Sequence, residues 1–239
     1  MSNPGRSVRG VSWREGAVGD SETSVRRLGR RLASTPMARD QGGNPEYTQR
    51  LVDLQTVWWK RILPVQAPYR WNLKRLHLGV TIDLGCGIGR NLLSLGEGSV
   101  GIDHDSLSVE YARSRGLTAY TPTEFAGSPD DRPGRFDSLL LSHVAEHMTA
   151  DELVDFVSPY LGDVKTGGKV VLICPQERGF RSDATHAEFV DFDAMRRFAT
   201  TTGLEPQRLY SFPFPRRAGT VFVYNEFVMV ARIPVASAG

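Results

Sequence analysis

Short apolar runs alternate with amphipathic stretches along most of the chain. The apolar runs have the length of β-strands, and they cover residues 80–84, 100–102, 117–120, 136–141, 169–173, 208–212 and 221–231. Apolar side chains recur at intervals of three and four over residues 47–63, which predicts an amphipathic helix there. Further helices are expected over residues 69–76, 90–95, 106–115, 149–160 and 189–202, between glycines, prolines and strands. Thr149 and Glu152 form a capping-box pattern where one of these helices begins.

The apolar runs predict the class of fold. Strands without a polar face must be covered on both sides, which is typical of a mostly parallel sheet between helices. We therefore expect an α/β fold, with a Rossmann-like sheet of seven strands, helices on both faces and an antiparallel last strand. Residues 79–239 would form this core and residues 46–78 a helical cap, together one domain. The last two strands are expected to pair as neighbours.

The N-terminal segment has a different composition. Residues 1–40 contain eight Arg and four acidic residues, few aromatics and no sustained periodicity, which predicts disorder. An Arg- and Ser-rich start is also typical of a transit peptide, but Glu15, Asp20 and Glu22 interrupt it. We expect residues 1–45 to be a disordered extension. Alternatively, the N-terminus is misassigned and translation starts at Met37.

Charge and composition narrow the classes of function. The net charge is +2 and residues 1–40 carry +4, so the remaining residues carry −2 and lack the basic surface of a nucleic-acid-binding protein. No apolar stretch approaches the roughly 20 residues of a membrane span. Cys86 and Cys174 stand apart, without the spacing of a disulfide framework or a metal site. We expect a cytoplasmic protein with no nucleic-acid partner, and its oligomeric state stays open.

A glycine-rich loop follows the strand predicted at residues 80–84. Gly85, Gly87 and Gly89 would let a cofactor approach the backbone closely. Asp103 ends the next strand, 18 residues after Gly85, where it could accept hydrogen bonds from ribose hydroxyls. Arg90 stands where dinucleotide-binding proteins have their third glycine, so the spacing disfavours a nucleotide-dependent oxidoreductase.

With Asp83 two residues before the first glycine, this loop resembles motif I of class I S-adenosylmethionine-dependent methyltransferases, and residues 100–103 resemble motif II. The resemblance extends over about residues 80–231. It implies that the loop holds the amino-acid part of the cofactor and that Asp103 holds the ribose. The further cofactor-binding residues that it implies are Gln66, Tyr69, Asp83, His104, Thr123, Glu124 and Phe125.

A second group of polar residues follows the strand predicted at residues 136–141. If residues 143–147 form one helical turn, His143, Glu146 and His147 share a face. The group resembles the E-x-x-E-H metal motif of ubiquinone-pathway O-methyltransferases and of small-RNA 3′-terminal 2′-O-methyltransferases, with His143 in place of the first Glu. The RNA enzymes add a histidine from the loop after the fifth strand, where this chain has His186.

These residues suggest how an acceptor hydroxyl would be activated. His143, Glu146, His147 and His186 are candidate ligands of a divalent metal, and His143 and Glu146 are candidate catalytic residues. The resemblance implies Mg²⁺ or Mn²⁺, whereas several imidazole ligands favour a transition metal, so the identity of the ion stays open. Without metal, a histidine would act as general base.

Arg216 and Tyr224 lie among aromatic residues near the C-terminus, a composition that suits the binding of a sugar. The segments 175–178 and 212–216 resemble those of actinobacterial methyltransferases that modify polysaccharides or glycolipids, such as methylmannose-polysaccharide O-methyltransferases. We expect a small-molecule or oligosaccharide acceptor. The alternatives are a phenol or quinone precursor, an RNA 3′ end, which the charge disfavours, and a catalytically inactive cofactor-binding module.

Overall fold

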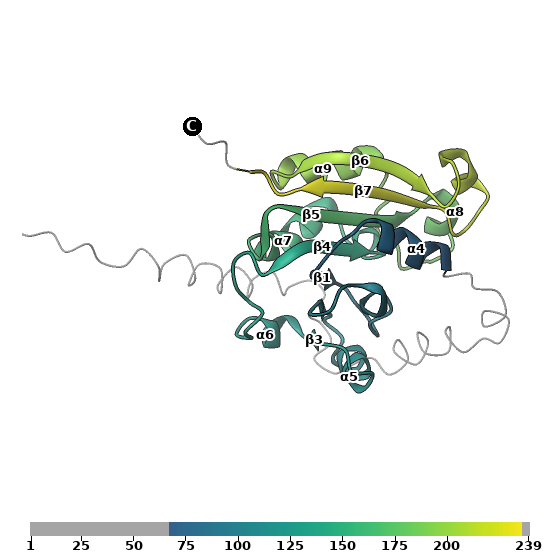
Figure 1. Cartoon of the computed structure of the whole chain (residues 1–239). Coiled ribbons are helices and arrows are strands. Elements are labelled where there is room, and N and C mark those ends of the chain that lie inside the picture. Colours follow the sequence, from purple (N-terminus) through teal and green to yellow (C-terminus); the bar gives the residue numbers. More distant parts are fainter. Residues whose placement is uncertain (1–66, 236–239) are drawn as a thin grey trace, which may run out of the picture.

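The structure, a computed structural model, describes residues 67–235 and is built around one sheet of seven strands (Figure 1). The strands lie in the order β3-β2-β1-β4-β5-β7-β6. Their bounds are β1 Thr81–Leu84, β2 Val100–Ile102, β3 Ala119–Tyr120, β4 Phe136–Ser142, β5 Val164–Pro175, β6 Glu205–Phe212 and β7 Glu226–Arg232. Strands β1 to β5 pair in parallel, and β7 is antiparallel to both of its neighbours. The predicted fold class is confirmed, including the pairing of the last two strands.

Helices cover both faces of the sheet. Their bounds are α4 Ala67–Arg75, α5 Ser106–Ser114, α6 Pro122–Phe125, α7 Ala150–Leu161, α8 Glu177–Phe180 and α9 Phe192–Thr201, with 3-10 turns η1 Leu92–Ser94, η2 Ala145–His147 and η3 Arg216–Thr220. Successive strand residues point to opposite faces. In β4, Leu139 therefore belongs to the core under α7 and α9, with Val157 and Met195, whereas Leu140 packs with Leu73 of α4 on the other face.

Several element boundaries differ from those expected. The helix expected at residues 90–95 is only the turn η1, because Gly89, Gly96 and Gly98 leave too short a segment between them. The strand expected from residue 221 begins at Glu226, since the preceding residues turn sharply after η3. The helix expected at residues 47–63, Gln66 and the N-terminal extension lie outside the described residues.

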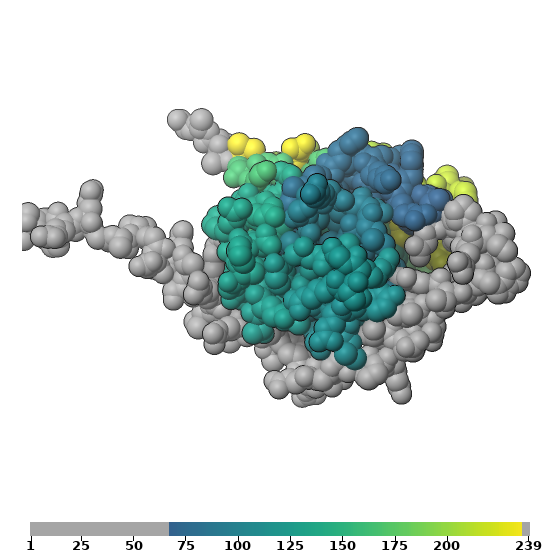
Figure 2. Space-filling view, turned by 60° about the horizontal axis from the view of Figure 1, so that its bottom comes forward, coloured from purple at the N-terminus to yellow at the C-terminus, as the bar shows by residue number. Residues whose placement is uncertain are grey.

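The strand order predicts where a ligand binds. We call the side of the sheet at which β1, β2 and β4 end the reaction edge. From β1 the chain builds outward through β2 and β3, then returns to pair β4 on the other side of β1. In sheets of this kind, ligands bind at such a reversal, beyond the carboxyl ends of the strands. Figure 2 shows one face, formed mainly by the teal middle part of the chain with the blue segment that starts at α4.

Among residues 67–235, no helix has the length and apolarity that a membrane span requires.

Candidate active site

The glycine loop directly follows β1 and is tied to β2. Gly85, Gly87 and Gly89 have positive φ angles of 73°, 51° and 79°, a region that side chains rarely occupy. A Cβ atom at Gly85 would overlap the side chain of Val144. The amide of Gly87 donates to Oδ2 of Asp103 at 2.7 Å, which fixes the loop against the end of β2. The backbone conformation and the close approach of Val144 therefore require glycine in this loop.

Asp103 is only 5% exposed and is held at both oxygens. Besides the bond from Gly87, its Oδ1 accepts the amide of Asp105 at 2.9 Å, and Nδ1 of His104 lies 3.4 Å from the same oxygen. Burial raises the pKa of Asp103, and these amides and His104 limit the rise. A carboxylate oxygen can accept more than one hydrogen bond, so Asp103 keeps acceptor capacity for ribose hydroxyls.

Asp83 is fully buried in β1, and neither of its oxygens has a hydrogen-bond partner among residues 67–235. Burial raises the pKa of Asp83 to about 7, against an opposing effect of the nearby Asn91 side chain, and the Asp103 carboxylate adds to the rise. A buried carboxylate without a partner is costly and calls for a cation or donor. The ammonium group of an S-adenosylmethionine molecule on the glycine loop would fit this requirement.

The other residues expected to contact the cofactor have different surroundings. Thr123 is exposed, and Glu124 pairs with Arg113, Nη2 to Oε2, at 2.9 Å. Phe125 is fully buried in the core against three aromatic side chains, and therefore offers adenine no surface. The Tyr69 hydroxyl donates to the carbonyl of Tyr224 at 2.6 Å, which brings an expected cofactor residue next to an expected substrate residue.

His143 lies just beyond β4 in a strained conformation. Its φ is 58° and its amide donates to the Ile173 carbonyl at 2.9 Å, so the helical turn expected at residues 143–147 is wrong, and only η2 forms. The ring is nevertheless held by two acids, with Nδ1 3.3 Å from Oε1 of Glu146 and Nε2 2.8 Å from Oε1 of Glu226. We call Glu146, His143 and Glu226 the Glu–His–Glu group.

The side chain of His143 is 46% exposed, although its two partners are buried. Withdrawal from solvent lowers the pKa of His143, but Glu146 and Glu226 outweigh that effect and raise it to about 10. Burial raises the pKa of Glu226, and His143 opposes the rise. At neutral pH the group therefore contains an imidazolium between acidic side chains, facing outward at the reaction edge.

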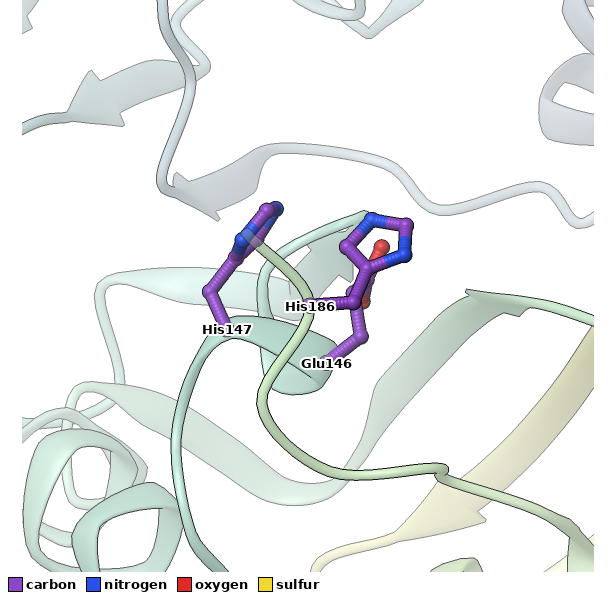
Figure 3. Close-up of side chains that lie close together, drawn as sticks. All are labelled: Glu146, His147 and His186. Carbon is purple, nitrogen blue, oxygen red and sulfur yellow. The ribbon is translucent and has the colours of Figure 1, made fainter. Parts of the chain in front are cut away.

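Glu146 also belongs to a second group with His147 and His186, and Figure 3 shows the three side chains gathered between η2 and the loop that carries His186. One ligand atom from each lies within 4.8 Å of the others. Nδ1 of His147 donates to the Thr185 carbonyl at 3.2 Å, and Nδ1 of His186 donates to the Phe180 carbonyl at 2.7 Å. Both Nε2 atoms therefore keep a lone pair for a ligand.

Glu146 is 0% exposed, and neither of its oxygens has a hydrogen bond of good geometry from residues 67–235. A buried carboxylate without a well-formed hydrogen bond, beside two imidazoles with free Nε2 atoms, fits a divalent cation. Of the predicted metal ligands, the structure thus brings Glu146, His147 and His186 together. His143 touches this group only through Glu146 and directs its other nitrogen to Glu226.

Arg216, expected to bind substrate, pairs through both guanidinium nitrogens with the carboxylate of Glu177. Its guanidinium lies 4.7 Å from the centre of the Phe227 ring, next to Glu226. Arg216 lowers the pKa of Glu177, so the ion pair persists at neutral pH. The Tyr224 side chain is 45% exposed, and no charged side chain among residues 67–235 stacks on its ring.

Glu226 is the functional candidate that the sequence analysis missed. Site residues are expected beyond the carboxyl ends of parallel strands, whereas β7 runs the other way. The first residue of an antiparallel strand reaches the edge at which its parallel neighbours end. The signal available in the sequence was an acidic residue inside the apolar run at residues 221–231.

Solved methyltransferase structures share this fold. A SAM-dependent methyltransferase from Archaeoglobus fulgidus matches with a TM-score of 0.52 at 15% identity, over 69% of this chain and 92% of that one. An S-adenosylmethionine-dependent methyltransferase from Mesorhizobium loti matches with a TM-score of 0.50 at 13% identity, over 70% and 100%. A geranyl diphosphate methyltransferase in complex with GPP and sinefungin matches with a TM-score of 0.52 at 13% identity, over 70% and 78%. No protein-family model and no curated protein matches the sequence.

The chain therefore has the fold of class I S-adenosylmethionine-dependent methyltransferases. At these identities the likeness concerns the fold alone, so substrate and chemistry must be argued from the residues of this chain.

The buried charge of Asp83 makes stability depend on pH. Its pKa is raised from 3.8 to about 7, so the fold loses stability as pH rises between these values, because the unfolded chain releases the proton first. Asp83→Asn should stabilise the unliganded protein at pH 8 by up to about 4 kcal/mol, with a smaller gain at pH 5. Denaturant titration at the two pH values measures this difference.

Asp137→Asn is the matched control, because Lys165 and the Val80 amide lower the pKa of Asp137. This variant should be no more stable than the unmodified protein at pH 8. Loss of stability in Asp83→Asn at pH 8 would contradict the assignment of Asp83 as an unpartnered buried acid.

Proposed function

We propose that this protein is an S-adenosylmethionine-dependent O-methyltransferase whose acceptor is a hydroxyl of a saccharide or a polysaccharide precursor. One observation carries the proposal: a glycine cradle with buried acids and the Glu–His–Glu group occur at the same edge of the sheet in a methyltransferase fold. The first suits a cationic donor with a ribose, and the second suits removal of a proton from an acceptor.

The residues around the glycine loop would hold the cofactor. Gly85, Gly87 and Gly89 leave its amino-acid part close to the backbone, Asp83 supplies a negative charge for the ammonium group, and Asp103 accepts from the ribose. When bound, S-adenosylmethionine supplies a methyl group, which moves to the acceptor oxygen as the carbon–sulfur bond breaks and leaves its electron pair on sulfur. His104, beside Asp103, would line the same site.

The Glu–His–Glu group would take the proton of the acceptor hydroxyl. Carboxylates accept hydrogen bonds and do not donate them, so each nitrogen of the His143 ring carries a proton toward its acid. Glu146 is therefore the group that can accept a further proton, and His143 stabilises the charge that forms on the acceptor oxygen. This division of roles replaces His143 alone as the base.

The surface beside the group supports a sugar acceptor. Phe214 and Tyr224 are about half exposed, and the ring of Phe222 packs edge-on against both. Exposed aromatic rings can cover the apolar face of a pyranose, and Arg216, two residues after Phe214 in the chain, carries donors for hydroxyl groups. A phenol or quinone precursor would use the aromatic rings but would offer Arg216 fewer hydroxyl groups.

A transfer assay with labelled methyl donor tests the acceptor. With a panel of saccharides and phenols, we expect transfer to a saccharide hydroxyl, and His143→Ala should lower the rate by about 100-fold or more. His143→Ala should still bind S-adenosylhomocysteine, because the polar partners of His143 among the described residues are Ile173, Glu146 and Glu226, outside the cradle. Transfer to phenols alone would contradict the acceptor, and a fully active His143→Ala would contradict the role of His143.

We further propose that the protein uses a divalent metal ion, held by Glu146, His147 and His186. When bound, the ion would lower the pKa of an acceptor hydroxyl and orient it. The hydrogen bonds from the Nδ1 atoms to backbone carbonyls fix both imidazole rings with Nε2 free. Two imidazoles and one carboxylate favour Mn²⁺ or another transition metal over Mg²⁺, because nitrogen donors suit softer ions.

Calorimetric titration of the metal-free protein with Mn²⁺ and with Mg²⁺ measures the affinity of this group. We expect Mn²⁺ to bind more tightly than Mg²⁺, and His186→Asn to weaken Mn²⁺ binding at least 10-fold. His77→Asn is the matched control, because His77 is exposed, lies outside the group and has the positive φ that Asn tolerates. Equal Mn²⁺ affinity in the two variants would contradict the metal site.

A further inference from the structure

We propose that Glu226 is a positioning residue that holds the His143 ring in one orientation toward the acceptor. This inference deepens the proposed function and rests on it. Oε1 of Glu226 lies 2.8 Å from Nε2 of His143, a shorter contact than the 3.3 Å between Nδ1 and Glu146. Of the two acids, Glu226 therefore makes the better hydrogen bond to the ring.

The partner matters because the backbone does little to fix this ring. His143 sits alone between β4 and η2, with the positive φ of a conformation that is unfavourable for its residue type. Its side chain is 46% exposed, so packing leaves about half of it free. A hydrogen bond to a buried acceptor is then the contact that selects one orientation.

Glu226 is itself held rigidly. It is the first residue of β7, in register with Pro175 at the end of β5 and with Phe212 at the end of β6. Only 7% of the residue is exposed, and its carbonyl accepts the side-chain amide of Gln176 at 2.9 Å. The acid therefore projects from between two strands and not from a free loop.

Two buried amides, Gln176 and Asn225, connect the end of β5 to the start of β7. The Gln176 amide donates to the Asn225 carbonyl, and the Asn225 side chain donates to Oε1 of Gln176, both at 2.9 Å. Oδ1 of Asn225 also accepts the amide of Phe214 at 3.0 Å. Both residues are 0% exposed. Burying a side-chain amide destabilises a fold unless the amide makes such hydrogen bonds. We call them the amide pair, and they fix the backbone from which Glu226 reaches His143.

The contacts of the two acids, Glu146 and Glu226, indicate two different roles. Glu146 faces His147 and His186 as well as His143, whereas Glu226 faces His143 alone among these histidines. Removing the Glu226 carboxylate should thus loosen the His143 ring and leave the Glu146, His147 and His186 group able to bind an ion. A purely structural acid would show no such selectivity.

The first test needs no acceptor. In nitrogen-edited NMR of the full chain, the Nε2 proton of His143 should give a signal protected from solvent exchange, identified by its loss in His143→Ala. Glu226→Gln should abolish that protection, and Glu226→Asp should retain part of it. Glu205→Gln is the matched control at the far end of β6, opposite Arg232, and should change nothing. An unprotected signal in the unmodified protein, or full protection in Glu226→Gln, would overturn the proposal.

The second test separates positioning from a structural role by a double-mutant cycle in the transfer assay. Glu226→Gln should lower kcat by about 10- to 100-fold with little change in KM, and should cost nothing further in the His143→Ala background. Equal losses in both backgrounds would overturn the proposal. Mn²⁺ affinity should be unchanged in Glu226→Gln. Failure of the protein to bind S-adenosylhomocysteine would instead sink the proposed function and leave the NMR result standing.

Discussion

Parallel strands of one sheet end at the same edge, and the candidate active site depends on that constraint. The loops after β1, β2 and β4 carry the glycine cradle, Asp103 and His143, residues that lie far apart in the sequence. β7 runs in the opposite direction, so its first residue, Glu226, comes to this edge as well. The reversal of a single strand thus adds an acid to a site that the parallel strands alone could not complete.

The edge concentrates buried negative charge. Asp83, Asp103, Glu146 and Glu226 are all nearly inaccessible, and His143 is the cation that touches two of them. Burying charge without a full set of partners destabilises a fold, so a protein tolerates it only where the rest of the core is well packed. Here the large apolar core under α7 and α9 supplies that stability. A methyl donor with a sulfonium and an ammonium group, together with a divalent ion, would balance the negative charge of these buried carboxylates.

The fold could be predicted well because its signal is local. Apolar runs identified every strand, and the capping box at Thr149 begins α7 as expected. Boundaries failed where glycines shortened the segment, as at η1, and where a turn after η3 delayed the start of β7.

The site was harder to predict because its geometry comes from distant segments. A helical turn was expected to align His143 with Glu146, but the hydrogen bond from His143 to Ile173 of β5 pulls that residue out of the turn. The sequence position of Phe125 suited an adenine contact, yet its ring is fully buried in the core. Glu226 could not be assigned without the pairing of β7 with β5.

Binding of S-adenosylhomocysteine to the full chain tests the central claim most directly, since the cradle at the end of β1 and β2 must recognise the donor before any transfer occurs. By calorimetry we expect a dissociation constant on the order of micromolar, about 8 kcal/mol of binding free energy, and no binding of NADH. Asp103→Ala should weaken the affinity for S-adenosylhomocysteine. Binding of NADH without binding of S-adenosylhomocysteine would contradict the account.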